Sequence, residues 1–130
     1  MEILFESTVF WAYDYELEAK SGLSQIAAQF SGVPPIHEHS GALRLSTGTI
    51  EIVGDVDLLI SLNDIEELYL GFDEVYHRNF VKNLGAFCQP LRIRSSNGFA
   101  KTTIYLIAGY SGSSCAPTQN LFNLLQQILS

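Results

Sequence analysis

Apolar and polar residues alternate through the stretch from Gly41 to Phe72, which contains four short runs with apolar side chains at every second position. Such alternation is typical of half-buried antiparallel strands, because successive side chains of a strand point to opposite faces. Turn-forming pairs separate the runs. These pairs are Thr47-Gly48, Gly54-Asp55 and Asn63-Asp64. The pattern predicts a four-strand meander with one buried face.

Three further segments have the composition of strands. Residues 2–13 are rich in aromatic and β-branched types, residues 90–94 alternate aliphatic side chains with two arginines, and residues 102–108 form the most β-prone run of the second half. These segments bring the expected strands to seven. The side chains expected to form the interior are Leu43, Leu45, Ile50, Ile52, Leu58, Ile60, Ile104 and Leu106.

Helical periodicity occurs in three places. Residues 21–32 carry apolar side chains at i, i+3, i+4 and i+7, which predicts a short helix after the first strand. Residues 72–87 suit a short helix or helical loop that Asp73 caps. Pro117 suits the first position of a C-terminal helix over residues 117–129. The residues expected to dock that helix on the open end of the sheet are Leu121, Leu124, Leu125 and Ile128.

Two short runs and the order of the elements carry a family resemblance. Residues 41–45 read GALRL and residues 65–72 read IEELYLGF, and the runs GFDEVYHR, QPLRIR and TTIYLI follow. These patterns resemble the pleckstrin-homology-like (PH/GRAM-like) barrel superfamily, and in particular an uncharacterised bacterial branch of it. The resemblance implies one α+β, mainly β domain over residues 1–130: a seven-stranded antiparallel PH-like barrel closed by a C-terminal helix, with a short helix after the first strand.

The chain departs from the phosphoinositide-binding members of that superfamily. Those members carry a cluster of Lys and Arg around the first hairpin, whereas the segment from Glu16 to Ser40 contains Lys20 as its only basic residue. The family also tends to place a Trp in the C-terminal helix, where this chain has Phe122. We therefore do not expect lipid binding at the usual site.

Composition narrows the class of protein. Hydrophobic residues make up 47% of the chain and charged residues only 16%, below the usual quarter, so we expect part of the surface to meet a partner. No apolar run approaches the roughly 18 residues of a membrane-spanning helix, and the first residues lack the basic region of a signal peptide. We expect a cytoplasmic protein. Cys88 and Cys115 fit no metal or redox motif, so we expect both to be reduced, with a single disulfide as the alternative.

Charge is unevenly distributed along the chain. All 14 acidic residues lie in the first 74 positions, whereas residues 75–130 contain five of the seven Lys and Arg residues. Arg92 and Arg94 share one face of a strand, and Lys101 begins the strand that pairs back, so these three cations form a candidate anion-binding site. The alternative is that they pair with carboxylates such as Glu66 or Glu67 on a neighbouring strand.

The other polar groups form no catalytic constellation. His37 and His39 are two residues apart and would project to one side of an extended chain, as zinc or nickel ligands do, but such a site requires a third ligand. His77 lies in a separate segment, and no nucleophile-elbow pattern surrounds a serine or cysteine that it could activate. We expect no catalytic residue, no metal site and no cofactor.

The leading hypothesis is a non-enzymatic interaction module that binds a protein partner, a second copy of the chain included. The alternative is a module that binds an anion or a lipid headgroup through Arg92, Arg94 and Lys101, and membrane-lipid contact belongs to that alternative. Nucleic acid is not an expected partner, because a chain with a pI near 4.7 repels the phosphate backbone.

Overall fold

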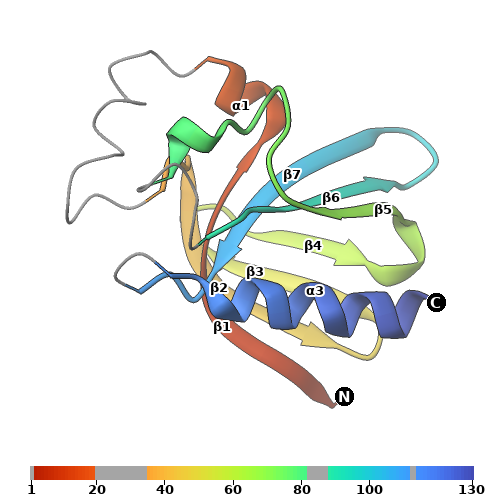
Figure 1. Cartoon of the computed structure of the whole chain (residues 1–130). Coiled ribbons are helices and arrows are strands. Elements are labelled where there is room, and N and C mark those ends of the chain that lie inside the picture. Colours follow the sequence, from red (N-terminus) through yellow and green to blue (C-terminus); the bar gives the residue numbers. More distant parts are fainter. Residues whose placement is uncertain (1, 20–34, 82–87, 112–113) are drawn as a thin grey trace.

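The computed structural model describes residues 2–19, 35–81, 88–111 and 114–130 (Figure 1). They contain seven strands, and a helix follows the last strand. The elements in chain order are β1 (Ile3–Tyr13), α1 (Asp14–Glu18), β2 (His39–Ser46), β3 (Thr49–Gly54), β4 (Leu58–Ser61), η1 (Leu62–Asp64), β5 (Ile65–Leu70), η2 (Arg78–Phe80), β6 (Leu91–Ser96), β7 (Lys101–Ala108) and α3 (Ala116–Leu129).

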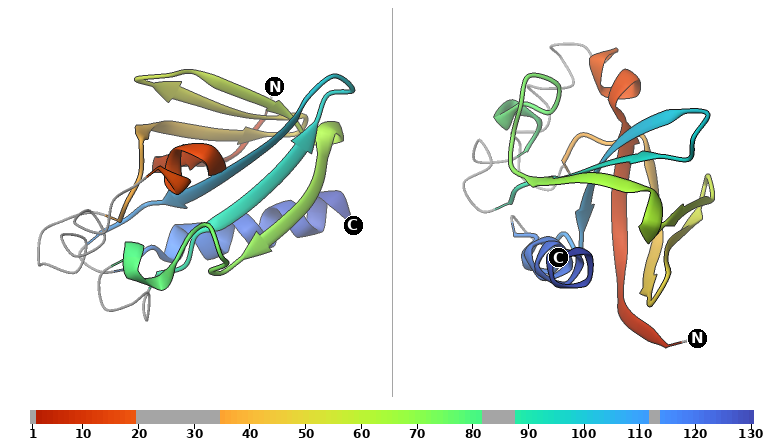
Figure 2. Two further views of the ribbon diagram at one scale, coloured as in Figure 1. Left: turned by 90° about the horizontal axis from the view of Figure 1, so that it is seen from above. Right: turned by 90° about the vertical axis from the view of Figure 1, so that its right-hand side faces the viewer.

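The strands form one antiparallel sheet in the order β4-β3-β2-β1-β7-β6-β5. The 11-residue strand β1 lies in the middle, since it pairs with β2 on one side and β7 on the other. Seen from the side, the β2–β4 and β5–β7 halves meet at a steep angle, with α3 beside them (Figure 2). The expected mainly β fold with a C-terminal helix is confirmed. The backbone pairing leaves the sheet open, with β4 and β5 as its two edges.

The predicted four-strand meander is correct for its first three strands and wrong for the fourth. β2, β3 and β4 pair in sequence, and the tight Thr47-Gly48 turn joins the first two as expected. After β4 the chain makes the 3₁₀ turn η1, whose first residue, Leu62, is buried and donates its N–H to the carbonyl of Gly48 (3.0 Å). This anchored turn carries the chain away from β4 instead of folding it back, so β5 pairs with β6 at the opposite edge.

The inner face of the sheet holds the main core, and its membership follows the predicted alternation. Seven of the eight expected interior residues are buried there, and Leu58 packs against them with partial exposure. The C-terminal helix docks on this core as predicted. Leu121 and Leu125 are fully buried, Leu124 packs at the margin, and Ile128 remains 38% exposed at the last turn.

A second buried cluster covers the opposite face of the central strands. Tyr105 and Ile107 of β7 point into it, which is why β7 reads as a continuous apolar run instead of an alternating one. Tyr76 and Phe80 cover these strands, and the Tyr76 hydroxyl donates a hydrogen bond to the carbonyl of Ile36 (3.2 Å). The central strands are therefore buried on both faces.

The helices apart from α3 agree only in part with the sequence-based expectations. The helix predicted over residues 21–32 lies outside the described residues. The short helix α1 begins earlier, directly after β1, where the Tyr13 N–H donates to the Glu16 carboxylate in a capping box (2.9 Å). In the predicted helical loop, Asp73 caps a turn as expected by accepting the N–H groups of Val75 and Tyr76 (both 2.8 Å). The described part of that loop contains the 3₁₀ turn η2, and residues 82–87 lie outside the described residues.

The expectation of two reduced cysteines is wrong. Cys88 and Cys115 are 27 residues apart in sequence, and the fold brings their Cα atoms to 5.1 Å, within a disulfide. Sequence spacing alone did not indicate this pairing, because the two residues meet only once β6, β7 and α3 have packed. Among the described residues, no helix is long and apolar enough to cross a membrane.

Candidate functional site

The three predicted anion-binding residues lie on one face of the β6–β7 hairpin. However, both arginines form ion pairs with carboxylates of the same chain. Arg92 forms ion pairs with Glu67 (2.6 Å) and Asp73 (2.7 Å), and Arg94 contacts the same Glu67 oxygen at 3.3 Å. Lys101 is exposed at the start of β7, opposite Ser96 of β6. The structure thus realises the alternative in which the arginines pair with acids of neighbouring segments.

Asp73 is the centre of this charge network. Its carboxylate accepts hydrogen bonds from Arg92 and from the Tyr105 hydroxyl (2.6 Å), in addition to the two backbone N–H groups that it caps. Burial by itself raises the pKa of Asp73, but the hydrogen bonds from Tyr105, the Tyr76 backbone, Arg92 and the Val75 backbone outweigh it and hold that pKa below its ordinary value. The network fixes the loop that follows β5, which is a structural role.

The candidate metal residues His37 and His39 are held by different partners. The His37 ring stacks on Phe10 (centroids 4.2 Å apart), and its Nδ1–H donates to the carbonyl of Pro35 (2.6 Å). His39 lies between two carboxylates, with Nε2 2.8 Å from Glu16 and Nδ1 2.9 Å from Asp55. No group of three His, Cys, Asp or Glu side chains suited to a metal ion occurs in the described part of the chain.

A groove runs between the edge strand β5 and the helix α3, which lie side by side (Figure 2). It has a volume of about 560 Å³. Its lining residues are Ile65, Glu66, Glu67 and Leu68 from β5 and Gln126, Leu129 and Ser130 from the C-terminal end of the chain. The helix and the strand run in opposite directions, because the start of α3 lies near Leu70, at the end of β5, whereas Leu129 lies near Ile65, at its start.

Local sequence explains why this groove exists. α3 buries Leu121 and Leu125 against the core, so the next residue on this stripe, Leu129, reaches beyond the sheet and stays 40% exposed. The pairing of β5 with β6 shifts register between Ile65 and Glu67, so Glu66 faces no residue of β6. A bulge of this kind is common at sheet edges and next to binding sites.

The groove offers three kinds of contact. In the described part of the chain β5 pairs on one side only, with β6, so its other side presents backbone donors and acceptors at the edge of the sheet. Leu68 and Leu129 supply apolar surface, and the exposed Glu66 supplies negative charge. An extended peptide with an aliphatic and a basic side chain complements this combination.

The sequence-based reasoning missed most of these residues as a site. Glu66 was considered only as a partner for the arginines. Leu68 appeared only within the run of residues 65–72, and Leu129 only as the last residue of the expected helix. The helical period indicated Leu129, because it follows Leu125 by four residues. The groove itself depends on β5 being an edge strand, which the predicted meander placed next to β4.

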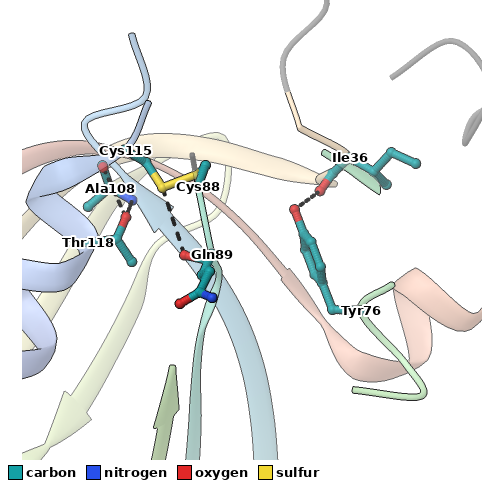
Figure 3. Close-up of a disulfide and its surroundings, with 7 residues drawn as sticks. All are labelled: Ile36, Tyr76, Cys88, Gln89, Ala108, Cys115 and Thr118. Atoms are coloured by element: carbon teal, nitrogen blue, oxygen red, sulfur yellow. Dashed lines mark hydrogen bonds between the residues drawn. A yellow bond between two sulfur atoms is a disulfide. The ribbon is translucent and has the colours of Figure 1, made fainter. Parts of the chain in front are cut away.

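The disulfide lines a separate hollow, where the end of β5 lies near the start of α3. Figure 3 shows Cys88 and Cys115 joined beside the start of α3, with Sγ of Cys115 3.8 Å from the carbonyl oxygen of Gln89. Next to it, the Thr118 hydroxyl donates to the carbonyl of Ala108 (3.1 Å) and accepts the N–H of the same residue (2.8 Å). The first turn of α3 is therefore fixed to β7 by hydrogen bonds and to the segment before β6 by a covalent bond.

The chain matches no family model and no curated protein sequence. Its function is therefore inferred from the groove, the charge network and the disulfide.

Proposed function

We propose that the protein is a non-enzymatic interaction module that binds an extended segment of a protein partner in the groove between β5 and α3. The observation that carries the proposal is an unpaired sheet edge flanked by a half-exposed helix face, with a depression between them. A segment that adds a strand to such an edge gains backbone hydrogen bonds, and its alternate side chains can enter the depression.

The lining residues define the chemistry of the partner. An aliphatic side chain of the bound segment contacts Leu68 and Leu129, and a Lys or Arg near it faces Glu66. The net charge of −7 favours the approach of such a basic segment from solution. It opposes binding of nucleic acid.

A PH-like fold and a cytoplasmic location are parts of the same proposal. Seven antiparallel strands followed by one helix, with the helix docked on the inner face of a bent sheet, support an incompletely closed PH-like barrel. Barrels of that superfamily serve mostly as binding modules, which agrees with an interaction role but does not by itself specify the partner.

Selection of peptides from a displayed random library against the oxidised protein, residues 1–130, tests this function. We expect selected peptides to combine aliphatic and basic residues. Leu129→Asp and Glu66→Lys should each weaken their binding by about tenfold or more, since each removes one kind of contact. Leu59→Asp is the matched control, because Leu59 is 66% exposed on the other edge strand, β4. Peptides that respond to Leu59→Asp but to neither groove variant would contradict the proposal.

The anion-binding alternative is supported only by a second depression, which Arg94, Lys101 and Thr103 line together with Glu66 and Glu67. The two carboxylates oppose an anion there. Titration with inorganic phosphate, followed by the NMR shifts of these residues, separates the two functions: saturable shifts that Lys101→Glu abolishes would favour the anion site.

A further inference from the structure

The Cys88–Cys115 disulfide lies where the start of α3, the start of β6 and the end of β5 meet, in a hollow separate from the groove. Cys115 directly precedes α3, and Cys88 precedes β6. Between Cys88 and β6, the carbonyl of Pro90 accepts a hydrogen bond from the N–H of Gly71, the residue that follows β5 (3.0 Å). The disulfide therefore ties the start of α3 to the start of β6 and, through Pro90, to the end of β5.

The bond borders a surface depression, and each cysteine is 4% exposed. Both cysteines line a hollow of about 320 Å³ whose other walls are Leu70, Gln89, Ala116, Thr118 and Gln119. Gln89, Ala116 and Gln119 are exposed, so the hollow opens to solvent. Thiol–disulfide exchange requires access of a thiolate to one sulfur atom, and this hollow provides an approach.

We propose that Cys88–Cys115 is a thiol-exchange site, at which a low-molecular-weight thiol opens the bond and thereby loosens the start of α3 relative to the end of β5, the two elements that border the groove. The attacking thiolate forms a bond to Sγ of Cys88, the bond between the two cysteines breaks, and its electron pair leaves on Sγ of Cys115. A second thiol then attacks the mixed disulfide, which releases the oxidised thiol and leaves Cys88 as a thiol. Two thiols are oxidised and one protein disulfide is reduced.

The positions of the two cysteines determine which sulfur atom is attacked and which one leaves. Cys115 is at the N-terminus of the 14-residue helix α3, where the unpaired N–H groups and the helix dipole stabilise a thiolate. Cys88 is not at the start of a helix in the described residues. Because the more stable thiolate leaves faster, attack at Cys88 with departure of Cys115 is favoured.

Opening the bond changes the groove without undocking the helix. Thr118 still bonds to Ala108, and Leu121 and Leu125 remain buried, so α3 keeps its main contacts with the sheet. What is lost is the link between the start of α3 and the end of β5. The distance between the groove walls is then less restrained. The site is therefore less preorganised, and a bound segment loses affinity. This consequence rests on the proposed peptide-binding function, whereas the exchange itself does not.

The environment is consistent with a labile bond. Disulfides of cytosolic proteins are usually transient, catalytic or redox-sensing, because the cellular thiol pool keeps most cysteines reduced. A disulfide that small thiols can open thus agrees with the proposed cytoplasmic location.

The exchange is tested on the oxidised protein, residues 1–130, with reduced glutathione as the thiol and no denaturant. Mass spectrometry of samples trapped by alkylation is expected to show a glutathione adduct on Cys88, followed by the free dithiol, while circular dichroism stays native. A bond that glutathione opens only in denaturant would overturn the proposal. An adduct found only on Cys115 would overturn its direction.

The coupling to the groove is tested separately. Hydrogen exchange at the first turn of α3 and at the end of β5 should be faster in the reduced protein, whereas exchange in β2 and β3 should not change. A peptide selected as described above should bind about tenfold more weakly to the reduced protein and to Cys88→Ser. Equal affinities in both redox states would overturn the coupling. If the oxidised protein binds no peptide, the proposed function fails, while the glutathione result still decides the exchange site.

Discussion

The charge state of His39 decides how strongly two segments of the chain are held together. Both ring nitrogens face carboxylates, Glu16 in α1 and Asp55 after β3, so only the doubly protonated ring can donate to both. Burial by itself lowers the pKa of His39, but the hydrogen bonds and charges of Asp55 and Glu16 outweigh it, and the pKa is raised above 6.5. The other rings against His39 are Trp11 and Tyr13, which carry no charge at neutral pH.

A pH dependence of stability follows from this geometry. A raised pKa means that the folded state holds the proton more tightly than the unfolded chain, so the stabilisation is full below about pH 6.5 and is lost as the pH rises through the folded pKa. At acidic pH a second group matters. The hydrogen bond from His39 lowers the pKa of Asp55, so Asp55 stabilises the fold until the pH falls through this lowered pKa and its carboxylate becomes protonated. We expect the melting temperature to fall as the pH rises above about 6.5.

His39→Gln should flatten this decrease in melting temperature, whereas His77→Gln should leave it unchanged, because His77 is exposed. Thermal melts of the three proteins at several pH values provide the measurement. An identical decrease in wild type and His39→Gln would show that another group is responsible.

Some contacts between single residues could be predicted from the sequence, and others could not. Pairing of Arg92 and Arg94 with Glu67 followed from cross-strand logic, since charges on neighbouring strands pair when the register allows it. The partners of His39 are 23 and 16 residues away in sequence, and they meet it only because β1, β2 and the turn after β3 adopt one particular register. Periodicity indicates which face a residue occupies, but not which residue faces it.

At the level of elements, local signals predicted α3 and the strands but not the neighbours of β5. The start of α3 followed from Pro117 and its buried face from the helical period. The position of β5 depends on the buried turn η1 and on β6, which comes 21 residues after β5 ends (Leu70 to Leu91). Alternation within a strand carries no information about its partner strand, and the groove could therefore not be predicted.

The docking of α3 can be tested with two truncations on the same helix. Leu125→Ala should destabilise the protein by about 2 to 5 kcal/mol, because it removes a fully buried side chain and leaves a cavity. Ile128→Ala should cost much less, since Ile128 is 38% exposed at the last turn. Chemical denaturation of both variants gives the comparison. Equal losses would mean that the helix does not pack by the stripe described above.

At the level of the whole molecule, the sheet formed by the described residues has two edge strands, β4 and β5, and the chain carries a strong negative charge. Edge strands invite pairing with other chains, and proteins commonly protect them with Lys, Pro or bulges. β5 has a bulge at Glu66, whereas the four residues of β4, LLIS, include neither Lys nor Pro. Leu59 of β4 and Val53 of β3 are exposed on the same outer face, 66% and 53% respectively. The net charge of −7 is then the main obstacle to pairing of β4 with a second copy.

Acidification should therefore promote self-association through β4. As the pH falls from about 7 towards the pI near 4.7, the repulsion between copies disappears while the apolar edge remains. We expect light scattering to rise over this range, and Leu59→Lys to suppress the rise because it places a charge on the edge itself. Ala100→Lys is the matched control, since it adds the same charge at an exposed position between β6 and β7. If both variants suppress association equally, net charge alone governs it. If only Leu59→Lys does so, β4 is the surface through which copies of this chain meet, and the groove at β5 remains free for a different partner.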